Sequence, residues 1–243
     1  MLWPKSPGER IVAIKIKSTK DVHTNGIKLV LYGASGSGKT VMAAAAPNPI
    51  IISAEKGLLS LADQDIPYME VKTIKSLDEA YKYCKDCDHD TIVIDSLSEV
   101  TQACLDEFTK TMLRESSTGK IDKRQAYGKI AEKIGNMIRN FRDLDGKNVI
   151  FIAKERKVED DDTGTITYEA YLPGKVLPFD LPYLVDEVFC LQITRKGERY
   201  IQTQGDFKRI CKDRSGTLDN PERPDFQLIF DKIKRGKNNG STA

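Results

Sequence analysis

The chain has 243 residues, enough for one large α/β domain or at most two small ones. Its 38 basic and 36 acidic residues nearly cancel, so the overall charge neither identifies nor excludes a nucleic-acid partner, because binding needs only a local basic surface. A mean hydropathy of −0.43, without any run approaching ~20 apolar residues, argues against a membrane span. Prolines and charges interrupt the N-terminus where a signal peptide would be apolar, so we expect a cytoplasmic protein.

The first part of the chain predicts strands that alternate with helices. Residues 1–26 are polar and contain one candidate strand at 11–16, so we expect an N-terminal arm or edge strand there. Further strands are expected at 28–32, 50–52, 68–71, 91–95 and 149–153, and helices at 39–46, 76–87, 97–112 and 127–141. Apolar strands that alternate with amphipathic helices are typical of parallel βαβ units under one sheet.

The later part of the chain has a different pattern. Residues 154–172 are polar and are interpreted as a hairpin, while 187–193, 199–202 and 209–212 predict short strands of an antiparallel extension. We therefore expect a core over residues 27–237 and a flexible tail at 238–243.

Five cysteines without an export signal predict reduced thiols. Cys84 and Cys87 have the spacing of a zinc half-site, but the sequence offers no second pair of ligands at a suitable spacing. Both fall at helical intervals with Leu77, Ala80 and Tyr81, so we interpret them as part of the buried stripe of one helix. Ser76 with Glu79 predicts a capping box at the start of that helix.

A phosphate-binding loop follows the first expected strand of the core. Its residues match the pattern G-x-x-x-x-G-K-[ST] in full: Gly33, Ala34, Ser35, Gly36, Ser37, Gly38, Lys39 and Thr40. The glycines allow backbone N–H groups to converge on phosphate oxygens, and the start of the next helix adds its positive end. Lys39 would contact the β- and γ-phosphates, and Thr40 would bind Mg²⁺ through its hydroxyl, so the motif implies ATP and Mg²⁺ as ligands.

Two carboxylates are expected beside this loop, because the carboxyl ends of parallel strands meet at the ligand crevice. Asp95 ends an apolar strand and would hold Mg²⁺ together with Thr40. Glu55 follows the strand at 50–52 and is a candidate base for the attacking water. Taken alone, Glu55 could equally be an ordinary exposed loop residue.

These stretches, in this order, resemble the RecA-type ATPase core. Ser53-Ala54-Glu55 is similar to the family's Ala-Glu pair, Asp95-Ser96 to its Asp-Ser strand end, and Lys154 stands where RecA has a glutamine that senses the γ-phosphate. The resemblance implies a three-layer α/β P-loop fold with a mainly parallel sheet, and catalytic roles for Glu55, Lys39 and Lys154.

Further motifs resemble the short phage RecA-like ATPases of single-strand annealing and recombination. They are Tyr127-Gly128-Lys129, Leu184-Val185-Asp186 and Lys212-Asp213-Arg214. This likeness implies DNA-stimulated ATP hydrolysis, with single-stranded DNA and a single-strand binding protein as candidate partners. It also implies assembly into a ring or filament, and the host cytoplasm as location if the gene is phage-encoded.

In RecA-like proteins two loops bind single-stranded DNA. Carried over to this chain, they offer Lys120, Lys123 and Arg124 in the first loop, and Arg156, Lys157 and Lys175 in the second, with Tyr168 or Tyr171 for stacking. Lys212 and Arg214 match the region where such subunits send basic residues into a neighbour's active site. Taken without the family resemblance, these charges are typical of a solvated surface.

Two other function classes share the phosphate loop. A small-molecule kinase would use residues 154–172 as a lid, with Arg156 as its one arginine. An ATP-binding scaffold for a replication or packaging partner would bind nucleotide without significant turnover. The Asn-Lys-x-Asp pattern of a GTP switch is absent after the expected strands.

Overall fold

The core of the molecule is one mixed β-sheet, and the computed structural model describes residues 18, 26–55, 57–116 and 119–238. Within these residues the main strands follow the order β3-β2-β4-β5-β1-β7-β8, with β6 paired to β5 and β9 to β7. The strands are β1 (Lys28–Gly33), β2 (Pro49–Ser53), β3 (Tyr68–Glu70), β4 (Thr91–Asp95), β5 (Asn148–Glu159), β6 (Ile166–Tyr171), β7 (Glu187–Ile193), β8 (Arg199–Gln202) and β9 (Lys212–Asp213).

The sheet is parallel from β3 to β7 and antiparallel at its additions. Lys28 of β1 aligns with Val149 of β5, and Leu29 with Glu187 of β7, so β1 lies at the centre between two parallel neighbours. Strands β6, β8 and β9 are antiparallel to their partners. Since β1 and its neighbours are buried on both faces, they read as continuous apolar runs rather than alternating ones.

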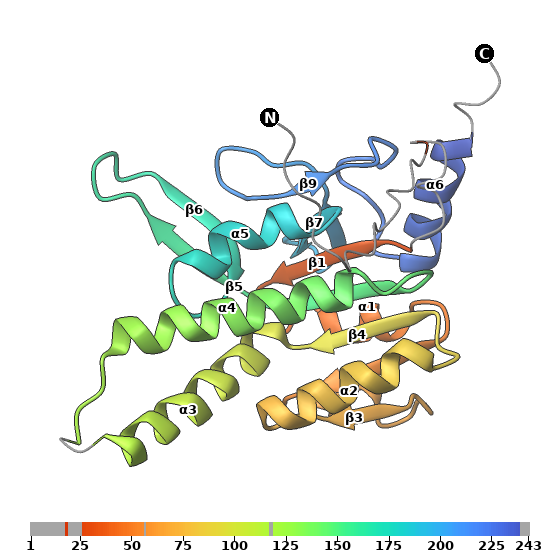
Figure 1. Cartoon of the computed structure of the whole chain (residues 1–243). Coiled ribbons are helices and arrows are strands. Elements are labelled where there is room, and N and C mark those ends of the chain that lie inside the picture. The colour runs from red at the N-terminus through yellow and green to blue at the C-terminus, as the bar shows by residue number, and fades with distance from the viewer. Residues whose placement is uncertain (1–17, 19–25, 56, 117–118, 239–243) are drawn as a thin grey trace, which may run out of the picture.

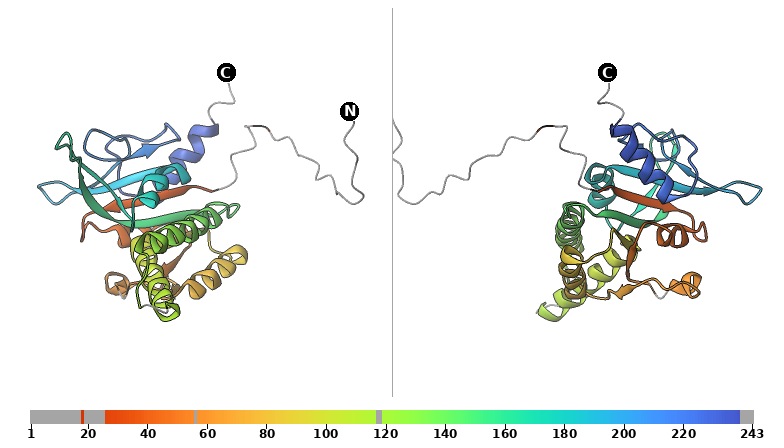
Figure 2. Two further views of the ribbon diagram at one scale, coloured as in Figure 1. Left: turned by 60° about the vertical axis from the view of Figure 1, so that its left-hand side comes forward. Right: turned by 90° about the vertical axis from the view of Figure 1, so that its right-hand side faces the viewer.

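Helices cover both faces of the sheet, which gives three layers (Figures 1 and 2). One face carries α2 (Ile74–Asp86), α3 (Leu97–Glu115), α4 (Lys123–Arg142) and α5 (Val176–Leu184). The other carries α1 (Lys39–Ala44), the 3₁₀ turn η2 (Leu58–Leu61) and α6 (Phe226–Asn238). Each face has its own apolar core. The predicted fold class, a three-layer α/β P-loop architecture with a mainly parallel sheet and an antiparallel extension, is confirmed.

Several local predictions are corrected. Thr73, not Ser76, caps α2: its side chain accepts from the Ser76 backbone N–H at 3.1 Å, and Ser76 completes the capping box that Glu79 was expected to complete. Cys84 is buried on α2, but Cys87 is the residue after the helix ends and is half-buried. The helical periodicity of the sequence predicts a helix one residue too long. The helix ends at Asp86 because the backbone is extended at Cys87.

The termini and the late strands also differ from the prediction. The arm at 1–26 and its strand at 11–16 lie outside the described residues except for Ser18 and Gly26. Helix α6 continues to Asn238, the first residue of the predicted tail, while 239–243 lie outside the described part. The strand expected at 209–212 is only Lys212–Asp213. The hairpin expected at 154–172 is confirmed as β5 and β6.

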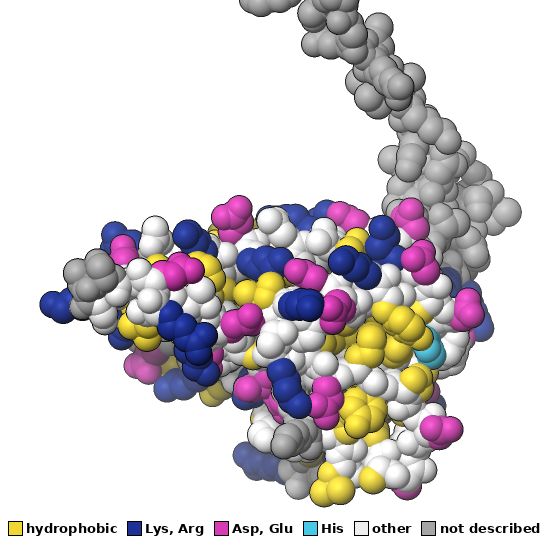
Figure 3. Space-filling view, turned by 60° about the horizontal axis from the view of Figure 1, so that its bottom comes forward, with side chains coloured by type: hydrophobic (Ala, Val, Ile, Leu, Met, Phe, Trp, Pro, Cys, Tyr) yellow, Lys and Arg dark blue, Asp and Glu magenta, His cyan; other side chains and the backbone are white. Residues whose placement is uncertain are grey.

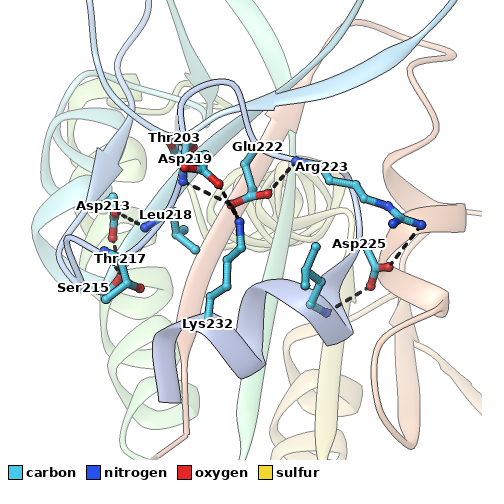
Figure 4. A network of polar contacts seen from close by, with 11 residues as sticks. Thr203, Asp213, Ser215, Thr217, Leu218, Asp219, Glu222, Arg223, Asp225 and Lys232 are labelled. Carbon is cyan, nitrogen blue, oxygen red and sulfur yellow. Dashed lines mark hydrogen bonds and ion pairs between the residues drawn. The ribbon is translucent and has the colours of Figure 1, made fainter. Parts of the chain in front are cut away.

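A polar network fixes the C-terminal helix to the rest of the core (Figure 4). Lys232 of α6 donates to Asp219 Oδ2 at 2.7 Å and to Glu222 Oε2 at 2.6 Å. Glu222 is almost fully buried and also accepts from two backbone N–H groups, those of Asp219 and Arg223. This network holds α6 over β1 and the neighbouring strands, where Phe226 and Phe230 fill the core.

Among the described residues, every helix is too short or too polar to cross a membrane. The face formed by α2, α3 and α4 carries Lys, Arg, Asp and Glu side chains in mixture (Figure 3). Charge on this face is therefore balanced rather than of one sign.

Candidate nucleotide site

The phosphate loop connects the carboxyl end of β1 to α1. Gly36 and Gly38 have φ angles of +75° and +97°, which side chains other than glycine rarely adopt. A Cβ at Gly38 would also lie 2.9 Å from Arg199 Nε, and that same nitrogen donates to the Ser37 carbonyl at 2.8 Å. Arg199 of β8 therefore supports the loop from the side opposite β5, and no local pattern in the sequence predicts this contact.

Lys39 and Ser37 are the two polar side chains of the loop that differ most in their hydrogen bonding. Lys39 Nζ donates to the carbonyls of Gly33 at 2.8 Å and Ala34 at 2.9 Å, and burial lowers the pKa of this ammonium. The buried Ser37 hydroxyl has no hydrogen-bond partner among the described residues. Ser37 does not line the cleft, whereas Lys39 does. Phosphate oxygens in the cleft would replace the carbonyls as partners of the Lys39 ammonium.

Thr40 and Asp95 meet at the base of the cleft. Thr40 Oγ1 donates to Asp95 Oδ2 at 2.7 Å, which joins α1 to the end of β4. Burial raises the pKa of Asp95, while the Thr40 hydrogen bond and the Lys39 charge oppose that rise. A hydroxyl and a carboxylate are the hard oxygen ligands that Mg²⁺ takes alongside water and phosphate. The residues present therefore fit magnesium, as predicted from the sequence.

Glu55 lies at the rim of the same cleft, beyond the end of β2. Its Oε1 accepts from Ser96 Oγ at 2.9 Å, and Ser53 Oγ donates to the Glu55 carbonyl at 2.7 Å. Ser96 also caps α3 by accepting from the Glu99 N–H, so its hydroxyl is fixed by the helix start. The carboxylate of Glu55 is thereby aimed along the cleft while it stays exposed to water.

Lys154, the expected γ-phosphate sensor, is at the end of the buried part of β5. Its ammonium forms an ion pair with Glu99, which raises the pKa of Lys154. Its backbone N–H donates to Ser98 Oγ at 3.0 Å. The cleft has a volume of about 450 Å³. It is lined by Gly33, Ser35, Gly36, Lys39, Thr40, Glu55, Asp95, Ser96, Ile152, Ala153, Lys154 and Glu155. Glu55, Lys39 and Lys154, which the sequence predicts together, thus share one cleft.

Glu155 of the cleft lining pairs with Arg209, a contact that sequence reasoning missed. Glu155 Oε2 lies 3.8 Å from Arg209 Nε and 3.6 Å from Cys190 Sγ. The Arg209 guanidinium lies 4.8 Å from the ring centroid of Tyr168 on β6. Only the tertiary fold brings positions 155 and 209 together, so no local pattern could have identified the pair.

The predicted DNA-binding residues fall into two groups. Arg124, Arg156 and Lys175 come from separate elements, yet with Tyr127 they line one hollow of about 590 Å³. Lys120, Lys123 and Lys157 are exposed and do not line it: Lys120 lies in the α3–α4 loop, Lys123 begins α4, and Lys157 pairs with Glu159 at 3.2 Å. The structure thus brings three of the six predicted positions into one hollow.

The predicted trans-acting residues lie at the other edge of the sheet. Lys212 pairs with Val188 near the amino end of β7, and its ammonium donates to the carbonyls of Pro182 and Val185. Arg214 Nη1 forms an ion pair with Asp186 at 3.0 Å. Both cations are held by groups of their own chain, and their trans role stays a prediction.

The Cys84 and Cys87 spacing has no metal-site counterpart in the part of the chain that is described. Among those residues, no group of three or more His, Cys, Asp or Glu side chains is placed to hold a metal ion. Burial raises the pKa of the Cys84 thiol to about 12, which is typical of a packed cysteine rather than a ligand.

A complete phosphate loop between a buried strand and a helix, facing an aspartate at the end of β4, defines a P-loop nucleoside triphosphatase. A family model described as an AAA domain matches residues 25–215. The chain therefore belongs to the AAA domain family, and its fold and cleft are those of an ATPase. No curated protein is detectably similar in sequence.

Two solved structures are similar to this chain. One is the KaiC-like protein PH0186 from the hyperthermophilic archaeon Pyrococcus horikoshii OT3, with 14% identity over 73% of this chain and 78% of that one, and a TM-score of 0.44. The other is a prototypical ATPase from the type III secretion system of pathogenic bacteria, with 14% identity and a TM-score of 0.45. It is matched over 80% of this chain and 64% of its own length.

Proposed function

We propose that the protein is a Mg²⁺-dependent, RecA-like ATPase that acts on single-stranded DNA in phage-type recombination or annealing. The hydrolytic part rests on one observation above all: Thr40, Asp95, Lys39 and Glu55 converge on a single cleft. The Thr40–Asp95 hydrogen bond of 2.7 Å places both oxygen ligands side by side. A bound Mg²⁺ would supply charge neutralisation on the phosphate oxygens.

The chain's own residues bind the phosphates, activate the attacking water and hold the base in position. The Lys39 ammonium and the loop N–H groups hold the phosphates. Glu55 orients a water and takes its proton as the water oxygen attacks the γ-phosphorus. The bond from that phosphorus to the β–γ bridging oxygen breaks, which releases ADP and inorganic phosphate. Ser96 holds Glu55 in position through its hydroxyl.

The role in DNA metabolism is supported by the hollow that Arg124, Arg156 and Lys175 share with Tyr127. Cationic side chains neutralise phosphates, and aromatic rings stack on bases without sequence preference. Assembly into a ring or filament, contact with a single-strand binding protein and action in a host cytoplasm belong to the same proposal.

The test is the rate of ATP hydrolysis with and without a single-stranded oligonucleotide, with Lys39→Ala as the inactive control. We expect Mg²⁺-dependent turnover that single-stranded DNA stimulates. Turnover that DNA leaves unchanged, together with no retention on a single-stranded DNA column at low salt, would refute the DNA role. Phosphate transfer to nucleosides or their monophosphates would instead identify a kinase, and a single-turnover experiment without product would identify a scaffold.

A further inference from the structure

Helix α5 exposes an apolar, aromatic face that the sequence does not predict. Leu177, Pro178 and Leu181 are buried against the sheet. Phe179 and Tyr183 point the other way, with 68% and 71% of their surface exposed, and their ring centroids are 5.6 Å apart. Two large aromatic rings that contact each other at a solvent-exposed surface indicate a binding surface for a partner.

This face lies beside a basic hollow and continues it. A second hollow, of about 250 Å³, is lined by Phe179, Tyr183 and Ile210 together with Arg156 and Lys175. Arg156 and Lys175 also line the hollow of about 590 Å³ that contains Arg124 and Tyr127. The two hollows therefore share a basic wall and form one groove. Its lining residues run from the first turns of α4 along α5 to Ile210, before β9.

The cations and aromatic rings of this groove indicate the class of ligand that it binds. Arg156 is held by Glu169, whose Oε1 accepts from Nε at 2.9 Å, so Arg124 and Lys175 remain to contact phosphates. Exposed rings beside separated cations match a strand whose bases stack while its backbone follows the positive groups. The α2–α4 face carries basic and acidic side chains in mixture (Figure 3).

We propose that this groove, formed by Arg124, Tyr127, Arg156, Lys175, Phe179 and Tyr183, is the track for single-stranded DNA, with bases stacked on Phe179 and Tyr183. The inference rests on the proposed function and adds to it the binding surface of α5. It extends the DNA contact from the loop residues that the family resemblance indicates to the exposed face of α5.

The test measures binding of a fluorescent oligothymidylate by anisotropy, in the presence of a non-hydrolysable ATP analogue. Replacing Phe179 or Tyr183 by alanine should weaken binding about 5- to 150-fold per ring, the range measured for base–aromatic stacking. Phe179→Trp keeps a ring and should bind like the wild type. Tyr83→Ala removes a ring that is 53% exposed on α2, remote from the groove, and should leave the affinity unchanged.

Salt dependence separates stacking from phosphate contacts. Lys175→Ala should reduce the slope of log K against log salt by about 0.7, the value for one phosphate of a single strand. Alanine at Phe179 or Tyr183 should leave the slope unchanged, because neither ring releases a counterion. Lys75→Ala on α2, whose lysine pairs with Glu79 at 3.8 Å, is the matched control.

Each outcome is decisive. If the wild type binds DNA and both ring variants bind equally well, the groove assignment is wrong while the proposed function stands. If the wild type does not bind DNA, both are wrong. If the ring variants bind DNA normally but change the sedimentation mass, a second copy of the chain covers α5, and the assignment is likewise overturned. Basal ATP hydrolysis and the melting temperature should be unchanged in all variants, because Phe179 and Tyr183 are exposed and lie outside the cleft.

Discussion

The substitution Glu55→Gln separates proton transfer from every other task in the cleft. Glutamine keeps the size of the side chain and the carbonyl oxygen that accepts from Ser96 Oγ, a contact of 2.9 Å in the structure. The position of the side chain is therefore kept, whereas its ability to take a proton is lost. General-base catalysis contributes typically 10²- to 10⁴-fold, so the turnover number should fall by that factor, or by about 3–5 kcal/mol in barrier height.

The assay is single-turnover hydrolysis of ATP, combined with a fluorescent-nucleotide measurement of affinity. ATP binding should stay within about threefold of the wild type, because Lys39 and the loop N–H groups are untouched. Glu79→Gln is the matched control, because Glu79 is an exposed glutamate of α2 that pairs with Lys75 at 3.8 Å and does not line the cleft. A Glu55→Gln variant with wild-type turnover would refute the assignment of Glu55 as the base.

Two further predictions concern the stability of the fold. Lys232→Met should lower the free energy of unfolding by about 1–3 kcal/mol, because it leaves the carboxylate of Glu222, only 3% exposed, without its cation. Asp219→Asn should cost about 0–1 kcal/mol, since Asp219 is 78% exposed; equal losses in urea melts would contradict this reasoning. Burial and the nearby Asp213 raise the pKa of Glu187 to about 8. The folded protein then binds more protons than the unfolded chain between about pH 4.5 and 8, so stability falls as pH rises through this window. Glu187→Gln should flatten that slope in denaturation followed by circular dichroism, and an unchanged slope would exclude Glu187 as its source.

The nucleotide site was predictable because its determinants are local. The loop needs glycine at Gly36 and Gly38, whose positive φ angles leave few other choices. Glu55 and Asp95 follow directly from the rule that parallel strands gather their carboxyl ends at one edge. The Thr40–Asp95 contact then follows from the fold alone.

Neither α5 nor α6 is among the helices predicted from the sequence, for two different reasons. Helix α5 is apolar on both its buried and its exposed side and contains Pro182. Its sequence therefore lacks the alternation of apolar and polar residues that predicts a helix. Helix α6 does show a period, with Phe226, Ile229, Phe230 and Ile233 on its buried stripe. This spacing is visible in the sequence and is sufficient to predict α6. Contacts such as Glu155 with Arg209 depend on strands that are distant in the chain.

Strand β5 joins the nucleotide cleft to the groove proposed for DNA. Lys154 and Glu155 line the nucleotide cleft, and Arg156, the next residue, lines the groove along α5. A ligand in the cleft and a ligand in the groove would therefore contact neighbouring residues of one strand. A bound strand of DNA that shifts Arg156 therefore acts on the residues beside the γ-phosphate position.

Thermodynamic linkage gives this connection a quantitative form. If DNA changes the affinity for the ATP analogue by some factor, the analogue must change the affinity for DNA by the same factor. We expect a factor of about 5–150, the usual range of coupling between two sites. Titrations of each ligand with and without the other measure both factors. The variant Arg156→Lys tests whether the coupling passes through Arg156. Lysine keeps the charge but cannot keep the guanidinium geometry of the contact with Glu169. A factor of one in the wild type would show that cleft and groove are independent, whatever binds to each.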